Sequence, residues 1–152
     1  MKKTALCIVI LLSCCTASLF AQAIGPDEIA IRALIDKFTP MWTTKDGAAI
    51  FKKISSETNF MQFSSNAIVT RDEFIQLLSQ MLRENPPVRH TYTIHKIVIS
   101  GDLAFERGIM ELVRTNGQTM KKESFNVFFR EESGWKLISN LPVAELRRAM
   151  TD

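Results

Sequence analysis

The sequence predicts an α+β domain in which a curved antiparallel β-sheet packs against about three N-terminal helices. Apolar residues recur at helical spacing between residues 27 and 84, and from Thr91 onward the pattern changes to a period of two. The later segments are separated by the short connections GD, NG and ESG, which are typical of tight turns between antiparallel strands. Helices followed by a run of strands predict one sheet with the helices on one of its faces.

Residues 1–23 have the pattern of a secretory signal peptide. Lys2 and Lys3 precede an apolar run, and Ala21 and Ala23 are the small residues expected before a cleavage site. The apolar run is shorter than a membrane span, which needs ~20 apolar residues, and it is differently flanked. We expect cleavage after Ala23, a secreted or periplasmic protein, and a single domain over residues 24–152.

All three cysteines, Cys7, Cys14 and Cys15, lie inside that segment. The processed chain would therefore contain no disulfide, no thiol nucleophile and no thiolate metal ligand. An alternative stays open, because LLSC at residues 11–14 resembles a bacterial lipobox in which Cys14 would be lipidated and anchor the protein to a membrane. That alternative leaves the AQA sequence at residues 21–23 unexplained.

The charge balance gives no sign of a nucleic-acid partner. Removing Lys2 and Lys3 from the 19 basic residues leaves 17 against 16 acidic residues, a net charge of +1. Nucleic-acid binding normally requires a broad basic surface, which this balance does not indicate. The length suits one domain with a hydrophobic core of its own.

The first element expected is an amphipathic helix over residues 27–42. Pro26 and the acidic residues Asp27 and Glu28 suit a helix start, and Pro40 should kink or loosen the last turn. One apolar face is formed by Ile31, Leu34, Ile35, Phe38, Met41 and Trp42. The TKDG sequence at residues 44–47 ends this helix, and residues 48–54 predict a short second one.

Residues 59–66 predict a short strand that leads into a turn. A longer helix should follow, because Thr70 and Glu73 have the spacing of a capping box and an apolar stripe comes after them. The NPP sequence at residues 85–87 should end this helix. We then expect four strands, at residues 91–100, 103–115, 119–132 and 135–143, with a final helical turn or tail at residues 143–150.

Both faces of these strands are apolar, although a sheet with one solvated face should be polar on that side. Phe125, Val127 and Phe129 lie on the face opposite Asn126. An exposed apolar patch of this kind predicts a homodimer in which a second copy covers it.

The order of these motifs resembles the SnoaL-like branch of the nuclear-transport-factor-2-like superfamily. The resemblance covers residues 27–142 and is carried by a helix that ends in W-x-x-x-D, the TRDEF helix start, GDLAFERG, and FFREESGWKLISN. It implies a cone-shaped fold whose curved sheet and helices enclose a cavity, often in a dimer.

The resemblance also allows the family's catalytic positions to be checked one at a time. Steroid isomerases of this fold use a carboxylate base, with a tyrosine and a protonated carboxylic acid as the oxyanion hole; the isomerase is a known example of such an arrangement. An ungapped alignment places Gln62 at the base position, Phe38 at the tyrosine position and Asn126 at the acid position. Glutamine cannot take a proton from carbon and phenylalanine cannot donate a hydrogen bond, so general-base catalysis is not expected from these positions.

We therefore expect a cavity that binds a small apolar or amphipathic molecule, without catalytic residues, metal or cofactor. Asn126 would donate a hydrogen bond to the ligand; alternatively, it is a buried amide satisfied by neighbouring strands. Trp135 should lie at the edge of the sheet, and His90 and His95 should lie on opposite faces, poorly placed to share a metal. The cavity-lining residues would be Phe38, Trp42, Gln62, Asn126 and Phe128.

Three functions remain open on this basis. The favoured one is an exported, non-catalytic protein that binds a small molecule. The alternatives are an enzyme of the isomerase, cyclase or hydrolase type that uses residues outside this alignment, and a dimeric protein-interaction module. The volume of the cavity would separate the interaction module from the other two, and a carboxylate or histidine that projects into that cavity would favour the enzyme.

Overall fold

The computed structural model describes residues 24–64 and 67–142. The predicted signal peptide, the Cys14 alternative and the predicted segment at residues 143–150 lie outside these residues. The elements are α1 (Pro26–Ile35), α2 (Phe38–Thr43), α3 (Gly47–Ile54), β1 (Met61–Ser64), β2 (Ala67–Thr70), α4 (Arg71–Glu84), β3 (Pro87–Ser100), β4 (Leu103–Arg114), β5 (Thr119–Glu131) and β6 (Gly134–Pro142).

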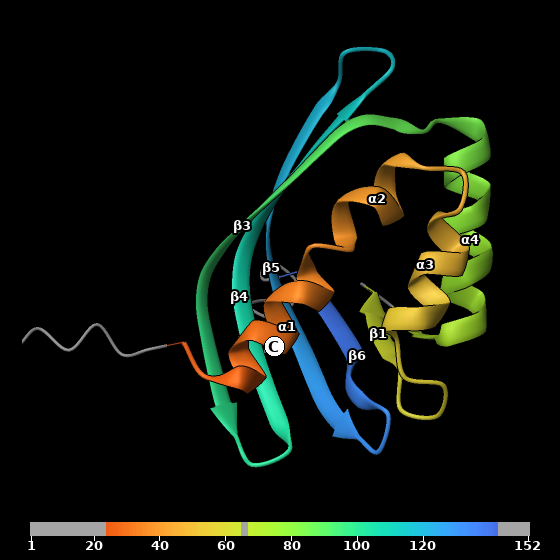
Figure 1. Cartoon of the computed structure of the whole chain (residues 1–152). Coiled ribbons are helices and arrows are strands. Elements are labelled where there is room, and N and C mark those ends of the chain that lie inside the picture. Colours follow the sequence, from red (N-terminus) through yellow and green to blue (C-terminus); the bar gives the residue numbers. More distant parts are fainter. Residues whose placement is uncertain (1–23, 65–66, 143–152) are drawn as a thin grey trace, which may run out of the picture.

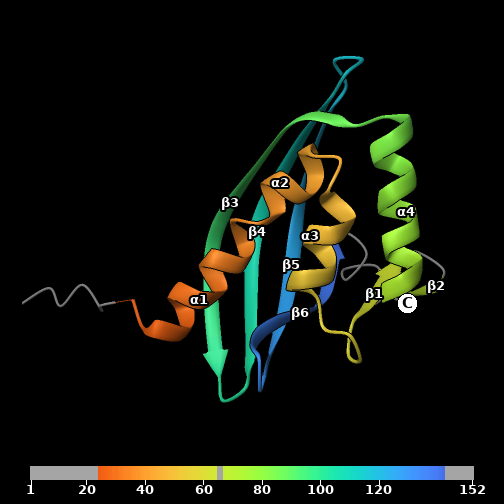
Figure 2. The same ribbon diagram turned by 45° about the vertical axis from the view of Figure 1, so that its right-hand side comes forward.

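The main sheet is an open antiparallel meander with the strand order β3-β4-β5-β6. It curves around the helices, which all lie on one of its faces (Figures 1 and 2). The three turns of the meander contain Gly101, Gly117 and Gly134, each with a positive φ (59°, 79° and 104°) that suits glycine. The predicted α+β class and meander are confirmed.

The core lies between the helices and the sheet. Alternate residues of β4 and β5 are buried because successive side chains of a strand point to opposite faces. Three aromatic rings, those of Phe51, Phe60 and Phe74, meet at centroid distances of 4.5–5.7 Å. The rest of the buried apolar core comes from both layers: Ile31, Ile35, Phe38, Met41, Ile54, Leu78, Ala104, Phe128, Trp135 and Leu137.

The single helix expected over residues 27–42 is in fact two helices. The break between them lies before Pro40, where the sequence analysis expected the kink. The chain leaves the helix at Asp36 and Lys37, and Pro40 lies within the first turn of α2. A proline ring clashes with the carbonyl four residues earlier, which here belongs to Asp36. The proline therefore acts upstream of its own position.

Two strand boundaries also differ from the prediction. A second strand, β2, follows β1 in the chain and pairs with it in a small antiparallel sheet, and β1 contacts β6. The strand β3 begins at Pro87 rather than at Thr91. The capping box of α4 is confirmed, since Thr70 Oγ1 accepts from the Glu73 backbone N–H and Glu73 accepts from the Thr70 backbone N–H.

Trp135 lies on β6, an edge strand of the main sheet, as the sequence predicts, but its side chain is buried. It is 7% exposed, and its Nε1 donates to Asp27 at the start of α1 (3.1 Å). Arg130 also pairs with Asp27 (2.5 Å) and lies over the Trp135 ring, 4.7 Å from its centroid. This contact joins the first helix to the β5–β6 hairpin, about a hundred residues later in the chain.

Candidate functional site

Five polar side chains from four strands meet on the helix-facing side of the sheet. We call this set the buried polar cluster, and its members are Tyr92 on β3, Glu106 on β4, Ser124 and Asn126 on β5, and Asn140 on β6. The strand register places Glu106 opposite Asn126, and Asn126 opposite Asn140. Glu106 and Asn126 are both fully buried.

The amide of Asn126 is occupied within this cluster. Its Nδ2 donates to the Tyr92 hydroxyl and to Glu106 Oε2, both at 2.7 Å. Its Oδ1 accepts from Asn140 Nδ2 at 2.5 Å. Both amide hydrogens are therefore used. A direct bond from Asn126 to a ligand stays a prediction, and it would require one of these bonds to open.

The two oxygens of the Glu106 carboxyl have different surroundings. Oε2 accepts from Tyr92 and from Asn126, each at 2.7 Å. Oε1 is buried and has no hydrogen-bond partner in the described part of the chain. Since Oε2 already accepts two donors, the proton of a neutral Glu106 belongs on Oε1.

Burial favours that neutral form. It raises the pKa of Glu106, although the hydrogen bonds from Asn126 and Tyr92 and the charge of Arg32 act in the opposite direction. Burial also raises the pKa of Tyr92, so its hydroxyl stays protonated. The cluster thus contains a buried carboxyl oxygen, Glu106 Oε1, for which the described residues supply no hydrogen-bond partner.

Gly108 provides the space in which this arrangement fits. A Cβ atom at this position would lie 2.6 Å from Glu106 Oε1, 2.6 Å from Tyr92 Cε1 and 2.7 Å from the Thr93 carbonyl oxygen. These distances are too short for any real side chain. The absence of a side chain allows the Tyr92 ring to cross the neighbouring strand and reach Glu106.

His90 lies next to the cluster on the same strand as Tyr92. It is 4% exposed, and its ring is roughly parallel to those of Trp42 (centroid distance 6.4 Å) and Tyr92 (6.3 Å). Its Nδ1 is 3.0 Å from the hydroxyl of Thr39, whereas its buried Nε2 has no partner among the described residues. Burial lowers the pKa of His90 to about 4, so the ring is neutral at physiological pH.

The five predicted cavity residues lie at different depths. Phe38 and Phe128 belong to the packed core, and the Phe38 ring meets the Tyr92 ring edge-on at 5.5 Å. Trp42 is half-buried on α2. Gln62 is half-buried on β1, with its Oε1 buried and unpartnered within the described chain. The core position of Phe38 and Phe128 is shown, and a ligand-binding role for the five residues remains a prediction.

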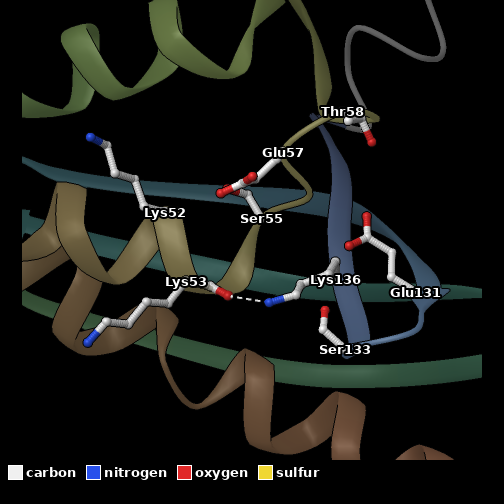
Figure 3. A pocket seen from close by; sticks show the side chains of 8 residues that line it. All are labelled: Lys52, Lys53, Ser55, Glu57, Thr58, Glu131, Ser133 and Lys136. Atoms are coloured by element: carbon white, nitrogen blue, oxygen red, sulfur yellow. Dashed lines mark hydrogen bonds between the residues drawn. The ribbon is translucent and has the colours of Figure 1, made fainter.

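A separate hollow of about 560 Å³ lies at the surface, beside the end of α3 and the β5–β6 turn (Figure 3). It contains none of the predicted cavity residues. Its lining is polar, and Lys136 donates to the Lys53 carbonyl at the end of α3 (2.9 Å), which stabilises the helix terminus. Arg71 donates a hydrogen bond to the Lys52 carbonyl oxygen in the same way (2.6 Å). This hollow does not suit an apolar ligand.

Within the described ranges, no group of three or more His, Cys, Asp or Glu residues could hold a metal ion. None of the helices in these ranges is both long and apolar enough to cross a membrane.

Glu106 is a site residue that was not predicted from the sequence. The neighbouring Arg107 points to the opposite face, where it is exposed and pairs with Glu123 (2.6 Å). A signal was nevertheless present. Glu106 shares its strand face with Ala104 and Leu112, both buried, so an acidic residue stands in an otherwise apolar row.

The fold and the site together define the class of protein. A curved antiparallel sheet with helices on one face and polar groups buried between them is the architecture of the nuclear-transport-factor-2-like superfamily. The SnoaL-like domain family matches residues 31–140, and the chain belongs to that family.

Solved structures share this fold at low sequence identity. A conserved protein from Planctomyces limnophilus DSM 3776 superposes with a TM-score of 0.65 at 17% identity, covering 76% of this chain and 97% of the other. A nuclear-transport-factor-2-like protein of unknown function from Shewanella oneidensis MR-1 gives a TM-score of 0.65 at 15% identity, with coverages of 75% and 96%. A domain of unknown function from Nostoc punctiforme PCC 73102 gives 0.62 at 17% identity, with coverages of 76% and 75%. A comparison with curated proteins finds no match.

Proposed function

We propose that this protein binds a small, largely apolar molecule between the helices and the sheet, with an acceptor oxygen of the ligand at Glu106 Oε1. The observation that supports this most directly is a fully buried carboxyl oxygen without a partner in the described chain. A buried polar atom without a hydrogen bond costs about 1–3 kcal/mol. A ligand carbonyl would accept the proton that the neutral acid carries on Oε1.

The surrounding residues give such a site its usual form, in which apolar walls enclose a few polar groups. Phe38, Trp42 and Phe128 supply aromatic surface. Asn126 and Tyr92 hold Oε2 and thereby orient Oε1. In this proposal Asn126 positions the acid, and Glu106 makes the contact that the sequence analysis assigned to Asn126.

The proposed site binds without turning its ligand over, because the family's base position carries Gln62. The same geometry supports a second candidate function, proton transfer by Glu106. A titratable group whose pKa is shifted by burial and by specific partners is a candidate acid–base catalyst. Glu106 is therefore the candidate acid–base residue of the enzyme alternative.

The binding proposal can be tested with a pair of probes that differ by one oxygen, 4-phenylcyclohexanone and phenylcyclohexane. Calorimetric titration should show that Glu106→Leu weakens the ketone about fivefold, the value of one neutral hydrogen bond, and leaves the hydrocarbon unchanged. Glu106→Gln should bind both as the wild type does, because an amide can accept at one position and donate at the other.

Thermal unfolding of each variant serves as the control for folding. Equal binding of the two probes to the wild type, or no binding of either, would overturn the proposal.

The two candidate functions are separated by incubation with 3-cyclohexen-1-one, a β,γ-unsaturated ketone. A binding protein leaves it unchanged over the uncatalysed rate. Wild-type isomerisation to the conjugated ketone that is lost in Glu106→Gln would instead assign an acid–base enzyme, since the glutamine keeps the hydrogen bonds and loses the transferable proton.

We also propose that the protein is exported, with cleavage after Ala23. The support is the signal-like composition of residues 1–23 and the start of α1 at Pro26, just beyond that site. The intact mass of the protein recovered from its native compartment should correspond to a chain that begins at Ile24. A diacylglyceryl adduct on Cys14 would show the lipoprotein alternative instead.

A further inference from the structure

A second buried polar atom lies close to the first. His90 Nε2 is buried without a partner in the described chain, and His90 stands two residues from Tyr92 on the same face of β3. The Tyr92 side chain lies between His90 and Glu106, because its ring faces the imidazole and its hydroxyl donates to the carboxyl. The helix α2 covers this pair of residues with Phe38, Thr39 and Trp42.

The two ring nitrogens of His90 have different surroundings. Nδ1 is within hydrogen-bond distance of the hydroxyl of Thr39 (3.0 Å). Nε2 lies across the ring from it and is buried. The rings of Trp42 and Tyr92 are roughly parallel to the imidazole (interplanar angles of 25° and 16°) and lie 6.4 and 6.3 Å from it. Nε2 is therefore the ring nitrogen that is left for a further polar contact.

We propose that His90 Nε2 is a second polar contact for the same ligand, so that the ligand class is a small apolar molecule with a carbonyl oxygen at one end and a hydroxyl group at the other. This inference rests on the proposed function, in which Glu106 contacts the carbonyl.

A hydroxyl group is the chemistry that fits Nε2. A neutral imidazole carries one N–H, and the Thr39 hydroxyl can either donate to Nδ1 or accept from it. Nε2 is a donor in the first case and an acceptor in the second. A hydroxyl group satisfies both cases. A carbonyl satisfies only the first, and an ammonium group only the second.

The rejection of molecules without the hydroxyl follows from the same geometry. A site built to hydrogen-bond a ligand group discriminates against analogues that lack it, because the buried protein atom is then left unpaired. His90 would therefore select among the ketones that Glu106 accepts.

The test compares 4-(4-hydroxyphenyl)cyclohexanone with 4-phenylcyclohexanone, which differ only by the distal hydroxyl. The wild type should bind the hydroxylated ketone about fivefold more tightly. His90→Phe keeps an aromatic ring at this position and removes both nitrogens, so it should abolish the preference. His95→Phe is the matched control, since His95 is an exposed histidine of the same strand, and it should keep the preference.

Each outcome bears on a different step. Equal binding of the two ketones to the wild type, or a preference that survives in His90→Phe, would overturn the role of His90 and leave the proposed function intact. No binding of either ketone would overturn both.

Nitrogen NMR of the wild type provides a measurement that does not depend on the folding of a variant. The Nε2 resonance of His90 should shift on addition of the hydroxylated ketone and not of its partner. An Nε2 resonance that responds equally to both would overturn the inference.

Discussion

Burial acts in opposite directions on the two titratable side chains of the interior. It lowers the pKa of His90 to about 4 and raises that of Glu106. Both shifts favour the neutral form of the group. Their effects on stability therefore fall on different sides of the pH scale, and this allows each residue to be examined separately.

The buried His90 should make the protein less stable at acidic pH. Below pH 6.5 the unfolded chain binds a proton at His90 that the folded chain excludes, so the free energy of unfolding should fall as the pH falls from about 6.5 to about 4. The loss attributable to this residue is at most about 3 kcal/mol. In urea denaturation across this range, the free energy of unfolding of His90→Phe should fall less steeply with falling pH than that of the wild type. His95→Phe should keep the slope of the wild type.

The same experiment reports on Glu106 with the opposite sign. Above its ordinary pKa of 4.5 the unfolded chain releases a proton that the folded chain retains, so the contribution of Glu106 is lost as the pH rises toward its folded pKa. Glu106→Gln should remove this loss. The pKa values of Asp27 and Glu73 are lowered, so the stability that depends on their ionised forms is lost at a more acidic pH than the stability that depends on neutral Glu106. Identical pH profiles of Glu106→Gln and the wild type would contradict the raised pKa.

A second prediction at the residue scale concerns Gly108. Gly108→Ala places a methyl group within 2.6 Å of the Glu106 carboxyl and the Tyr92 ring, and one of its close neighbours is backbone. Overpacking of this kind should lower the free energy of unfolding by about 1–3 kcal/mol. Gly25→Ala is the control, because nothing lies within 4 Å of the added carbon. If Gly108→Ala proved as stable as the wild type in urea denaturation, the cluster would have to be loosely packed.

At the scale of elements, the sequence predicted best where a local signal decides the structure. The capping box of α4 is formed by two residues three positions apart, and the strand turns contain glycines in conformations that only glycine favours. The break between α1 and α2 was placed too late because the steric effect of Pro40 falls on Asp36, four residues earlier. The strand β2 was missed because it has only four residues, which lie between a turn predicted from the sequence and the strong helix signal of α4.

The candidate site could be predicted only in part for a related reason. Asn126 stood out as a polar residue in an aromatic strand, and its pairing with Glu106 follows from strand register. The role of Tyr92 does not follow from register, which places it opposite Met110 and shifts between Ile94 and Lys96. Its contact with Glu106 depends on the length of the tyrosine side chain and on the absence of one at Gly108.

The contribution of the α4 capping box to stability can be measured by substitution. Thr70→Ala removes the hydroxyl that accepts from the Glu73 backbone N–H, and should lower the free energy of unfolding by about 1 kcal/mol. Ser79→Ala is a suitable control, because the Ser79 hydroxyl only donates back to the Ile75 carbonyl within the same helix (2.7 Å). Equal stability of the two variants in urea denaturation would argue that packing against α3, rather than the cap, sets the stability of α4.

At the scale of the whole molecule, the two faces of the sheet raise different questions. The helix-facing side is covered within the chain. On the opposite side, the register places Val98 beside Phe105, Phe105 beside Val127, and Leu103 beside Phe129. The Phe105 and Phe125 rings stack at 5.8 Å, while Val98 and Leu103 are 45% and 38% exposed. A continuous apolar patch therefore extends across three strands.

We propose that a second copy of the chain covers this patch. In a two-fold dimer the same surface meets itself, so an apolar patch needs no separate partner to be complementary to it. The charged pairs Arg107–Glu123 and Arg89–Glu111 lie on the same strands, and both signs of charge are present there for contact with a symmetry-related copy. Charged residues beside an apolar centre are the usual composition of an interface.

Val127→Asp tests this dimer, because it places a charge at the centre of the patch while Val127 is only half-buried in the single chain. The wild type should be a dimer by light scattering at micromolar concentration, and the variant should shift toward monomer by tenfold or more in dissociation constant, since a charge buried without a partner is costly. Leu77→Asp adds the same charge at an exposed position of α4 (55% exposed) and should remain a dimer. Thermal unfolding distinguishes a folded monomer of Val127→Asp from an unfolded chain. A monomeric wild type at this concentration would contradict the dimer and leave the apolar patch to a different partner.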